Sequence, residues 1–373
     1  MTEEFYEITT SNRNFFKRCR RKWYFQSPMG RHLVPRDERP NIHLWFGTGF
    51  HFALEDYHGY NLFGDPVLAL EAYFHAFRES ERPEEAEDII ALGMGMFEHY
   101  KRWLPRRDLY QTVWLDGKPL LETRFALELT EVKADKPVIY RGTIDRIVEN
   151  EYEEWLTQDY KTAASIDWNK MANDPQISTY VWAAEQFFQR EVVGMVYSQF
   201  AKKTPQPPTP LKTGGISANK QQKTTHSLYR EALLELYPDG DFPAKNIECL
   251  NHFASLETVE GDEYIRSDVV TRNQYAKEAT YRSIVAEAQE MVNPDTVMYP
   301  NPTRDCAWDC DFRSVCLMMD EGDDWEEYIE QNYKRKEEHH SDESWRKRIK
   351  WPNGNTESET SDGDSFRISS SKG

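Results

Sequence analysis

Hydrophobic residues recur at helical spacing through the first hundred positions of the chain. Ser11 can cap a short helix that continues to Tyr24, and the segment 44–60 carries apolar residues along one side of a longer helix. Two more helices are predicted over 66–79 and 84–104 from the same pattern. The chain therefore opens with a helical region.

The pattern then changes to an alternation of apolar and polar residues. Over 120–129 the odd-numbered residues form an apolar face, while Glu122 lies on the polar face. Two further strand-like runs, 138–150 and 152–162, meet at a turn around Asn150. Together the three runs predict a three-stranded meander.

The second half of the chain mixes helices and strands. Asp174 and Pro175 form a helix start, with the aspartate as N-cap and the proline at the first helical position, and this helix runs to about Arg190. The remaining predicted elements are strands over 192–201 and 247–256 and a long amphipathic helix over 273–292.

This order of elements predicts an α/β fold in which helices flank a mixed sheet. We divide the chain into a helical segment over 1–110, a sheet-bearing core over 111–300, a cysteine-bearing segment over 301–320 and an acidic tail over 321–373. The tail ends in a stretch rich in Ser and Gly and is predicted to be disordered.

The net charge of −18 over 373 residues weakens any interpretation in which the protein binds nucleic acid, because phosphates require Lys and Arg. The charge is uneven, however. Acidic residues crowd 320–330 and 357–364, whereas 13–38 and 202–223 are basic. The distribution matters more than the sum. The segment 202–225, rich in Pro, Lys, Thr and Gly, is predicted to be a loop, either a lid that faces DNA or a surface insertion.

No stretch approaches the roughly 18 apolar residues that a membrane helix needs. The N-terminus also lacks the basic and then apolar pattern of a signal peptide. A soluble, cytoplasmic protein is therefore expected. Five cysteines in such a chain favour metal ligands or buried hydrophobic residues over disulfides.

Two carboxylates and a lysine lie on neighbouring strands of the predicted meander. Asp145 is on one strand, and Asp159 and Lys161 lie two positions apart on the next, so their side chains share a face. Carboxylates that meet in this way form an oxygen site for Mg²⁺ or Mn²⁺. A lysine beside them can orient a water or stabilise charge on a phosphate. Taken alone, each fragment is more typical of surface charges near strand ends.

Further polar residues occur on the predicted helices. Gln176 and Tyr180 are four positions apart and therefore neighbours on one face. His51 follows two glycines that allow close packing, although a lone histidine more often has a structural role, which we assign to His58.

The order of these residues resembles the RecB-like branch of the PD-(D/E)XK nuclease family. The matching elements are a histidine (His51), GxxDR (Gly142 to Arg146), DxK (Asp159 to Lys161) and QxxxY (Gln176 to Tyr180). The resemblance covers roughly 10–320. It implies a restriction-endonuclease-like fold with the nuclease core at 111–300.

The same resemblance implies roles for the individual residues. His51, Asp145 and Asp159 would bind the catalytic metal, together with the carbonyl of Tyr160, and Lys161 would assist the attacking water. Gln176 and Tyr180 would organise the site and contact DNA. A nitrogen ligand among oxygens suits Mn²⁺ at least as well as Mg²⁺. Glu122 is a weaker candidate, either for a supporting role or as a solvated charge.

Cys306, Cys310 and Cys316 follow a C-x3-C-x5-C pattern that is typical of a thiolate metal site. Three ligands leave such a site one short, and Cys19 is the natural fourth. From spacing alone, Cys₄ zinc and an iron–sulfur cluster both fit. Cys249 lies in an apolar run and is predicted to be a buried hydrophobic residue.

AddB-type and CRISPR-associated RecB-like nucleases have one cysteine before the nuclease core and three after it, which hold a [4Fe–4S] cluster. The present chain is similar, except that its first C-terminal gap is three residues rather than two. The resemblance therefore implies a [4Fe–4S] cluster that joins the N- and C-terminal segments. Such a crosslink would be structural. The basic and aromatic stretch around Cys19 could hold single-stranded DNA or belong to the core.

These features predict a metal-dependent exonuclease that acts on DNA ends, with single-stranded DNA as the favoured substrate, in recombination, repair or phage DNA processing. A bacterial or phage-infected cytoplasm and recombination or replication proteins as partners are expected with it. Two alternatives are a nuclease that trims DNA for CRISPR adaptation and a DNA-binding module without catalysis. The intact Asp145, Asp159 and Lys161 argue against the last.

Overall fold

A seven-stranded mixed sheet lies at the centre of the protein in the computed structural model, which describes residues 5–37, 41–167, 169, 171, 174–336 and 345–352. The strand order is β1-β7-β8-β9-β10, and β3 and β6 also pair with β7. The strands are β1 (Tyr6–Thr9), β3 (Gln111–Thr112), β6 (Leu121–Glu128), β7 (Val138–Glu149), β8 (Trp155–Ala163), β9 (Val192–Ala201) and β10 (Ile265–Thr271).

The predicted meander is confirmed. Strands β6, β7 and β8 pair antiparallel in sequence, so the segments that carry the candidate carboxylates are neighbours in the sheet. Strand β9 then lies parallel to β8, which requires a crossover, and α6 (Pro175–Phe188) provides it. The predicted cap is also present, because the Asp174 side chain accepts a hydrogen bond from the backbone N–H of Gln176 at 2.8 Å.

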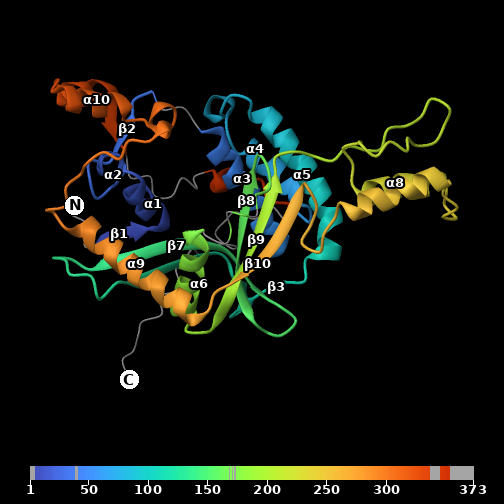
Figure 1. Cartoon of the computed structure of the whole chain (residues 1–373), viewed down its shortest axis with the longest axis horizontal. Coiled ribbons are helices and arrows are strands. Elements are labelled where there is room, and N and C mark those ends of the chain that lie inside the picture. The colour runs from blue at the N-terminus through green and yellow to red at the C-terminus, as the bar shows by residue number, and fades with distance from the viewer. Residues whose placement is uncertain are drawn as a thin grey trace.

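Helices cover both faces of the sheet (Figure 1). On one side α6 and α9 (Gln274–Val292) pack in a hydrophobic core with β6, β7 and β9. On the other side α3 (Ile42–His58), α4 (Pro66–His75) and α5 (Ala86–Arg107) form an aromatic core with residues of β8 and β9. The predicted mixed sheet flanked by helices is thus confirmed, and it holds α3 against the strands that bear the acidic residues.

Two local predictions were wrong. The segment 247–256 is part of a helix, α8 (Ala244–Ser255), rather than a strand. Its fully buried Cys249 and Phe253 are four residues apart, which is a helical spacing, and they pack against α7 (His226–Leu236). The first helix is also interrupted, because Cys19 adopts an extended conformation between α1 (Thr10–Arg18) and α2 (Arg20–Gln26). Its N-cap is Thr9, not Ser11.

The two ends of the described chain lie side by side. Strand β2 (Leu33–Pro35) pairs antiparallel with β11 (Tyr333–Arg335), and the rings of Phe25 and Phe312 stack with centroids 5.3 Å apart. Helices α10 (Arg313–Glu321) and α11 (Trp325–Asn332) complete this small core. The segments that carry Cys19 and the C-terminal cysteines therefore pack together.

The prediction of a disordered tail from residue 321 is wrong for its first part. Helix α11 and strand β11 form there because Ile329 and Tyr333 bury their side chains in the core between the chain ends. Farther along, Trp345 packs edge-on against Phe52 of α3 at 5.2 Å. The rest of the predicted tail, 337–344 and 353–373, lies outside the described residues.

Candidate active site

The backbone of β8 is tied to the aspartate of β7. The N–H of Tyr160 donates a hydrogen bond to Oδ2 of Asp145 at 2.9 Å, and this carboxylate is only 11% exposed. This bond links the two strands beyond the antiparallel pairs that end at Arg146 and Gln158. It holds Asp145 beside the DxK segment, as the sequence predicted.

His51 reaches the same carboxylate from helix α3. Its Nδ1 lies 3.4 Å from Oδ2 of Asp145 and 3.7 Å from Oε1 of Glu122, and its Nε2 lies 3.1 Å from the carbonyl oxygen of Tyr160. Burial alone would lower the pKa of His51, but the two carboxylates outweigh it and raise this pKa to about 9. When no metal ion is bound, the imidazole is therefore protonated at neutral pH and forms ion pairs with the two carboxylates.

Glu122 belongs to this group, although sequence analysis left open whether it supports the site or is a solvated charge. It stands on β6 across from Asp145, between the pairs Leu121–Arg146 and Thr123–Ile144. Its backbone has φ 41°, a left-handed conformation that is unfavourable for a glutamate. Strain of this kind persists only where surrounding structure imposes it, and it often marks functional sites. No alternation of apolar residues signals such a bend.

Asp159 and Lys161 share a face of β8, as predicted. Oδ1 of Asp159 accepts a hydrogen bond from Nζ of Lys161 at 2.9 Å and a long one from Gln176 at 3.5 Å. Its Oδ2 is buried and has no hydrogen-bond partner among the described residues. Burial raises the pKa of Asp159 to about 6, against the opposing effect of the lysine. An unsatisfied buried carboxylate oxygen of this kind is a ready ligand for a cation.

Helix α6 and strand β9 close the other side of the site. Gln176 and Tyr180 lie on the first two turns of α6, and burial beside Asp159 raises the pKa of Tyr180 to about 12. Tyr197 of β9 is paired with Asp159 in the parallel register, so both side chains share a face. Burial followed by the same carboxylate raises the pKa of Tyr197 to about 12. Sequence analysis missed Tyr197, because only the strand register brings it here.

A buried polar layer supports the site from behind. Nη1 of Arg146 lies 3.0 Å from Oε1 of Gln158 and 3.4 Å from the hydroxyl of Tyr160. The ring of His58 stacks on that of Tyr160 at 6.1 Å, and its Nε2 pairs with the Tyr100 hydroxyl at 2.6 Å. These contacts are consistent with the structural role that we predicted for His58. They also fix the position of Tyr160. Its backbone carbonyl contacts His51, and its backbone N–H donates to Asp145.

The donor atoms fit a hard divalent cation. Within the described part of the chain, one group of three or more His, Cys, Asp or Glu side chains has all its ligand atoms within 4.8 Å of one another, and it consists of His51, Glu122 and Asp145. The unsatisfied oxygen of Asp159 lies on the adjacent strand. One imidazole among carboxylate oxygens suits Mn²⁺ or Mg²⁺.

Comparison with protein families decides the class of protein. Residues 7–317 match the model of the PD-(D/E)XK nuclease superfamily, a span that includes every residue of the site. The chain belongs to this superfamily. None of the curated proteins matches the sequence.

This nuclease-superfamily chain also brings its four predicted cluster ligands to the junction of its ends. Cys19 separates α1 from α2, Cys306 lies in a short 3₁₀ turn, Cys310 follows it, and Cys316 lies in α10. No three of their sulfur atoms lie within 4.8 Å of one another.

Several N–H groups point at these sulfurs. The Sγ of Cys19 accepts from the backbone N–H of Asn301 at 3.4 Å, and that of Cys306 accepts from Thr303 at 3.4 Å. The guanidinium of Arg21 donates to Sγ of Cys316 at 3.1 Å. Such donors stabilise the negative charge of thiolates, so the residues present fit a cluster held by cysteines. Cys249, by contrast, is fully buried far from this junction, as predicted.

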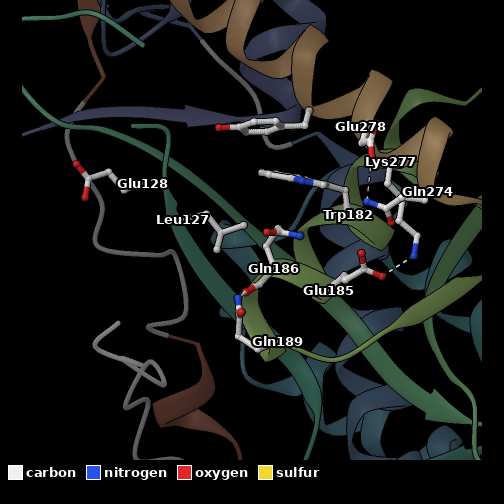
Figure 2. Close-up of a pocket in the computed structure, with 10 residues that line it drawn as sticks. Leu127, Glu128, Trp182, Glu185, Gln186, Gln189, Gln274, Lys277 and Glu278 are labelled. Carbon is white, nitrogen blue, oxygen red and sulfur yellow. Dashed lines mark hydrogen bonds and ion pairs between the residues drawn. The ribbon is translucent and has the colours of Figure 1, made fainter. Parts of the chain in front are cut away.

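A pocket on another part of the molecule is separate from this site (Figure 2). It lies between α6, α9 and β6, and its walls include Trp182 and the buried ion pair of Lys277 with Glu185 at 2.5 Å. None of the candidate site residues lines it.

Among the described residues, no helix combines the length and the apolar character that crossing a bilayer requires.

Proposed function

We propose that the protein is a RecB-like DNA exonuclease that hydrolyses phosphodiester bonds at DNA ends, with single-stranded ends as its preferred substrate. The observation that carries this proposal is the convergence of His51, Glu122 and Asp145 next to the Asp159–Lys161 pair. The superfamily match supports phosphodiester hydrolysis as the reaction.

Four side chains and one backbone carbonyl are proposed to hold the catalytic ion: His51, Glu122, Asp145, Asp159 and the carbonyl of Tyr160. A bound Mn²⁺ or Mg²⁺ would supply a water of lowered pKa and would offset the charge of the phosphate. In hydrolysis the water oxygen bonds to phosphorus, the bond to one bridging sugar oxygen breaks, and that oxygen takes up a proton.

Lys161 is proposed to position the attacking water. Burial lowers the pKa of this lysine, but Asp159 and Asp145 outweigh burial and raise it, so the side chain stays charged at neutral pH. A charged ammonium held by Asp159 can donate to the water and stabilise charge on the phosphate. Gln176 and Tyr180, on the same side, are proposed to orient the DNA strand.

We further propose that Cys19, Cys306, Cys310 and Cys316 hold a [4Fe–4S] cluster. The N–H groups that donate to three of the sulfurs support thiolate ligation, and the placement of one cysteine before the nuclease core and three after it supports a [4Fe–4S] cluster. The cluster would crosslink segments that already pack together, and its role would be structural.

The reaction is tested with end-labelled linear DNA and circular DNA, each single- or double-stranded, incubated with the anaerobically purified protein and Mn²⁺ or Mg²⁺. Release of label from linear DNA, with circular DNA left intact, is the expected result. Cleavage of circles would overturn the exonuclease assignment. A folded protein that cleaves neither form with either metal would overturn catalysis and favour a DNA-binding module.

A further inference from the structure

An arm of 59 residues interrupts the sheet between β9 and β10. It comprises residues 202–260, with a loop over 202–225 followed by helices α7 and α8, and it projects from the body beside α5 (Figure 1). The arm has its own small core, in which Tyr229, Leu233 and Phe253 are almost fully buried. It starts at the end of β9, where the backbone N–H of Lys202 bonds to the carbonyl of Ala163, the last residue of β8. Its root therefore adjoins the strand that carries Asp159 and Lys161.

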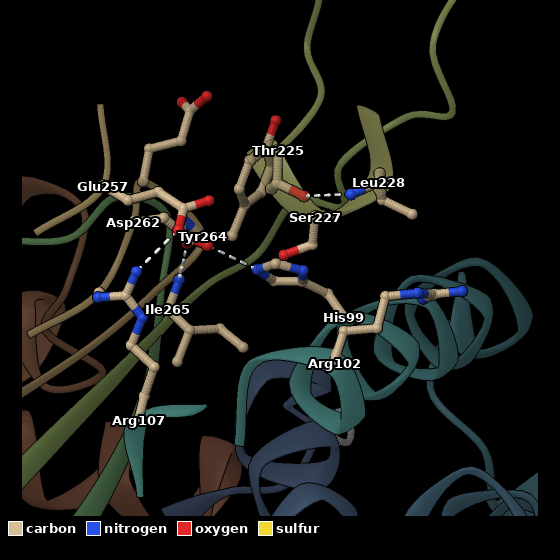
Figure 3. Close-up of polar contacts among 12 residues, drawn as sticks. His99, Arg102, Arg107, Thr225, Ser227, Leu228, Glu257, Asp262, Tyr264 and Ile265 are labelled. Atoms are coloured by element: carbon tan, nitrogen blue, oxygen red, sulfur yellow. Dashed lines mark hydrogen bonds and ion pairs between the residues drawn. The ribbon is translucent and has the colours of Figure 1, made fainter. Parts of the chain in front are cut away.

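The base of the arm is fastened to α5 by polar contacts (Figure 3). Asp262 lies just after the arm, where the chain leads back to β10; its Oδ2 is 2.9 Å from Nε2 of His99, and both side chains are less than a tenth exposed. Beside them Arg107 of α5 pairs with Glu257 at 2.7 Å. Because these pairs are largely withdrawn from water, they hold the arm in one orientation relative to the body.

The loop of the arm is held in shape by its own hydrogen bonds. The backbone N–H of Gln206 bonds to the carbonyl of Lys223 at 2.6 Å, and the Gln222 side chain bridges Thr209 and Ser217. The Tyr229 hydroxyl of α7 fastens the loop through the carbonyl of Ser217 at 2.9 Å. The side chains along the loop thus project from a defined backbone.

The loop is basic in an acidic protein. Residues 202–225 contain five lysines and no Asp or Glu, whereas the whole chain carries a net charge of −18. Lys202 and Lys203 are engaged at the root, beside His43 and Glu263 respectively. The other three, Lys212, Lys220 and Lys223, are exposed, and none has a carboxylate partner among the described residues. Exposed lysines without partners on an ordered backbone suit a polyanion.

We infer that this loop binds the sugar–phosphate backbone of duplex DNA that flanks the end being processed. The inference rests on the proposed function. The loop contains no aromatic residue, so it offers no platform on which the bases of a single strand could stack. It does offer lysines, small hydroxyl and amide side chains, and backbone N–H groups, which are the usual partners of phosphates. Contacts of this kind give affinity without sequence preference.

The test measures binding without catalysis. Labelled duplex DNA with a single-stranded overhang, and the isolated single strand, are titrated with protein in EDTA over a range of KCl concentrations. The variant is Lys212→Gln, Lys220→Gln and Lys223→Gln combined. The matched control replaces three exposed lysines elsewhere in the same way, Lys133, Lys334 and Lys347.

For the loop variant we expect roughly tenfold weaker binding of the duplex substrate, and a slope of log K against log[KCl] that is reduced by about 3. The control variant should bind the duplex substrate as the parent does. The loop variant should bind the isolated single strand, and cleave a short single strand, as the parent does. An unchanged duplex slope would overturn the inference, and so would an equal loss for the single strand. If the parent protein cleaves no DNA but the duplex effect is present, the proposed function fails while the loop remains a DNA-binding surface.

Discussion

Nε2 of His51 lies 3.1 Å from the carbonyl oxygen of Tyr160, a residue 109 positions further along the chain. In the metal-free protein the raised pKa of His51 leaves both ring nitrogens protonated, so Nε2–H donates to this carbonyl and Nδ1–H faces Asp145 and Glu122. The contact joins α3 to β8. It explains how a helix far from these strands in sequence brings a histidine to the candidate site.

Replacing His51 with Asn should abolish most activity and leave the fold intact. The change would remove a proposed metal ligand, whereas loss of a supporting partner alone costs about 10- to 100-fold in affinity or activity, so we expect at least about a 100-fold loss. Cleavage rates as a function of Mn²⁺ concentration, with thermal melts alongside, measure both effects. The control is His75→Asn, an exposed histidine on α4, which should behave as the parent. Parental rates for the His51 variant would remove it from the site.

Substitutions of Glu122 should affect the stability of the protein and its activity differently. Its left-handed backbone costs about 1–2 kcal/mol, which a glycine would not incur. We therefore expect Glu122→Gly to keep or raise the melting temperature while activity falls at least about 100-fold, as for His51. Glu122→Gln, which retains the shape, should lose activity to a similar extent. If Glu122→Gln cleaves DNA as the parent does, Glu122 serves only as a partner of His51.

The sequence was sufficient for the parts of the fold that depend on local pattern. The meander followed from alternation, and α6 followed from the Asp174–Pro175 cap. The DxK pair followed from the two-residue period of a strand. The helix α8 was mistaken for a strand because a segment of ten residues is too short for its apolar positions to decide between the two periods, although Cys249 and Phe253 are at helical spacing. The break at Cys19 was missed because α1 and α2 follow one another with a single extended residue between them.

The rest of the site depends on contacts between distant residues. The left-handed turn at Glu122 comes from its packing in the sheet, and Tyr197 comes to the site only through the register of β8 with β9. The pair of His99 with Asp262 spans 163 positions. No local pattern specifies such pairs, so the attachment of the arm could not be predicted from the sequence.

The buried pair at the base of the arm predicts a dependence of stability on pH. Burial raises the pKa of Asp262, but hydrogen bonds and charge from His99 and two backbone N–H groups outweigh burial and lower it. Because the folded-state pKa is below that of the unfolded chain, this stabilisation is present above about pH 4 and is lost as the pH falls through the folded-state value.

Asp262→Asn should accordingly lower the free energy of unfolding by about 1–3 kcal/mol at pH 7, since buried polar partners lose a charged acceptor. The difference between parent and variant should shrink as the pH falls below 4. Denaturant unfolding at several pH values measures it. The exposed Asp116→Asn is a suitable control. A difference that is constant with pH would show that Asp262 is not ionised in the folded protein.

If the four cysteines hold the proposed [4Fe–4S] cluster, the purified protein should be coloured. Cys19→Ser should lose iron and visible absorbance, and it should be less stable by about 4 kcal/mol, because a crosslink from residue 19 to residue 306 closes a very long loop. Iron analysis and thermal melts of anaerobically purified protein measure these effects. Cys249→Ala should keep the iron and the colour, since Cys249 lies in the core of the arm. A colourless parent that contains zinc would contradict the iron–sulfur assignment.

Single-turnover cleavage of end-labelled DNA by Lys161→Ala and Asp145→Ala, compared with the parent over a range of Mn²⁺ concentrations, tests the central claim most directly. The account predicts metal-dependent cleavage by the parent and a loss of at least about 100-fold in both variants. Additional Mn²⁺ should restore neither fully, since Lys161 acts on the water and Asp145 also holds the backbone of Tyr160. Cleavage by either variant at the parental rate would contradict the account.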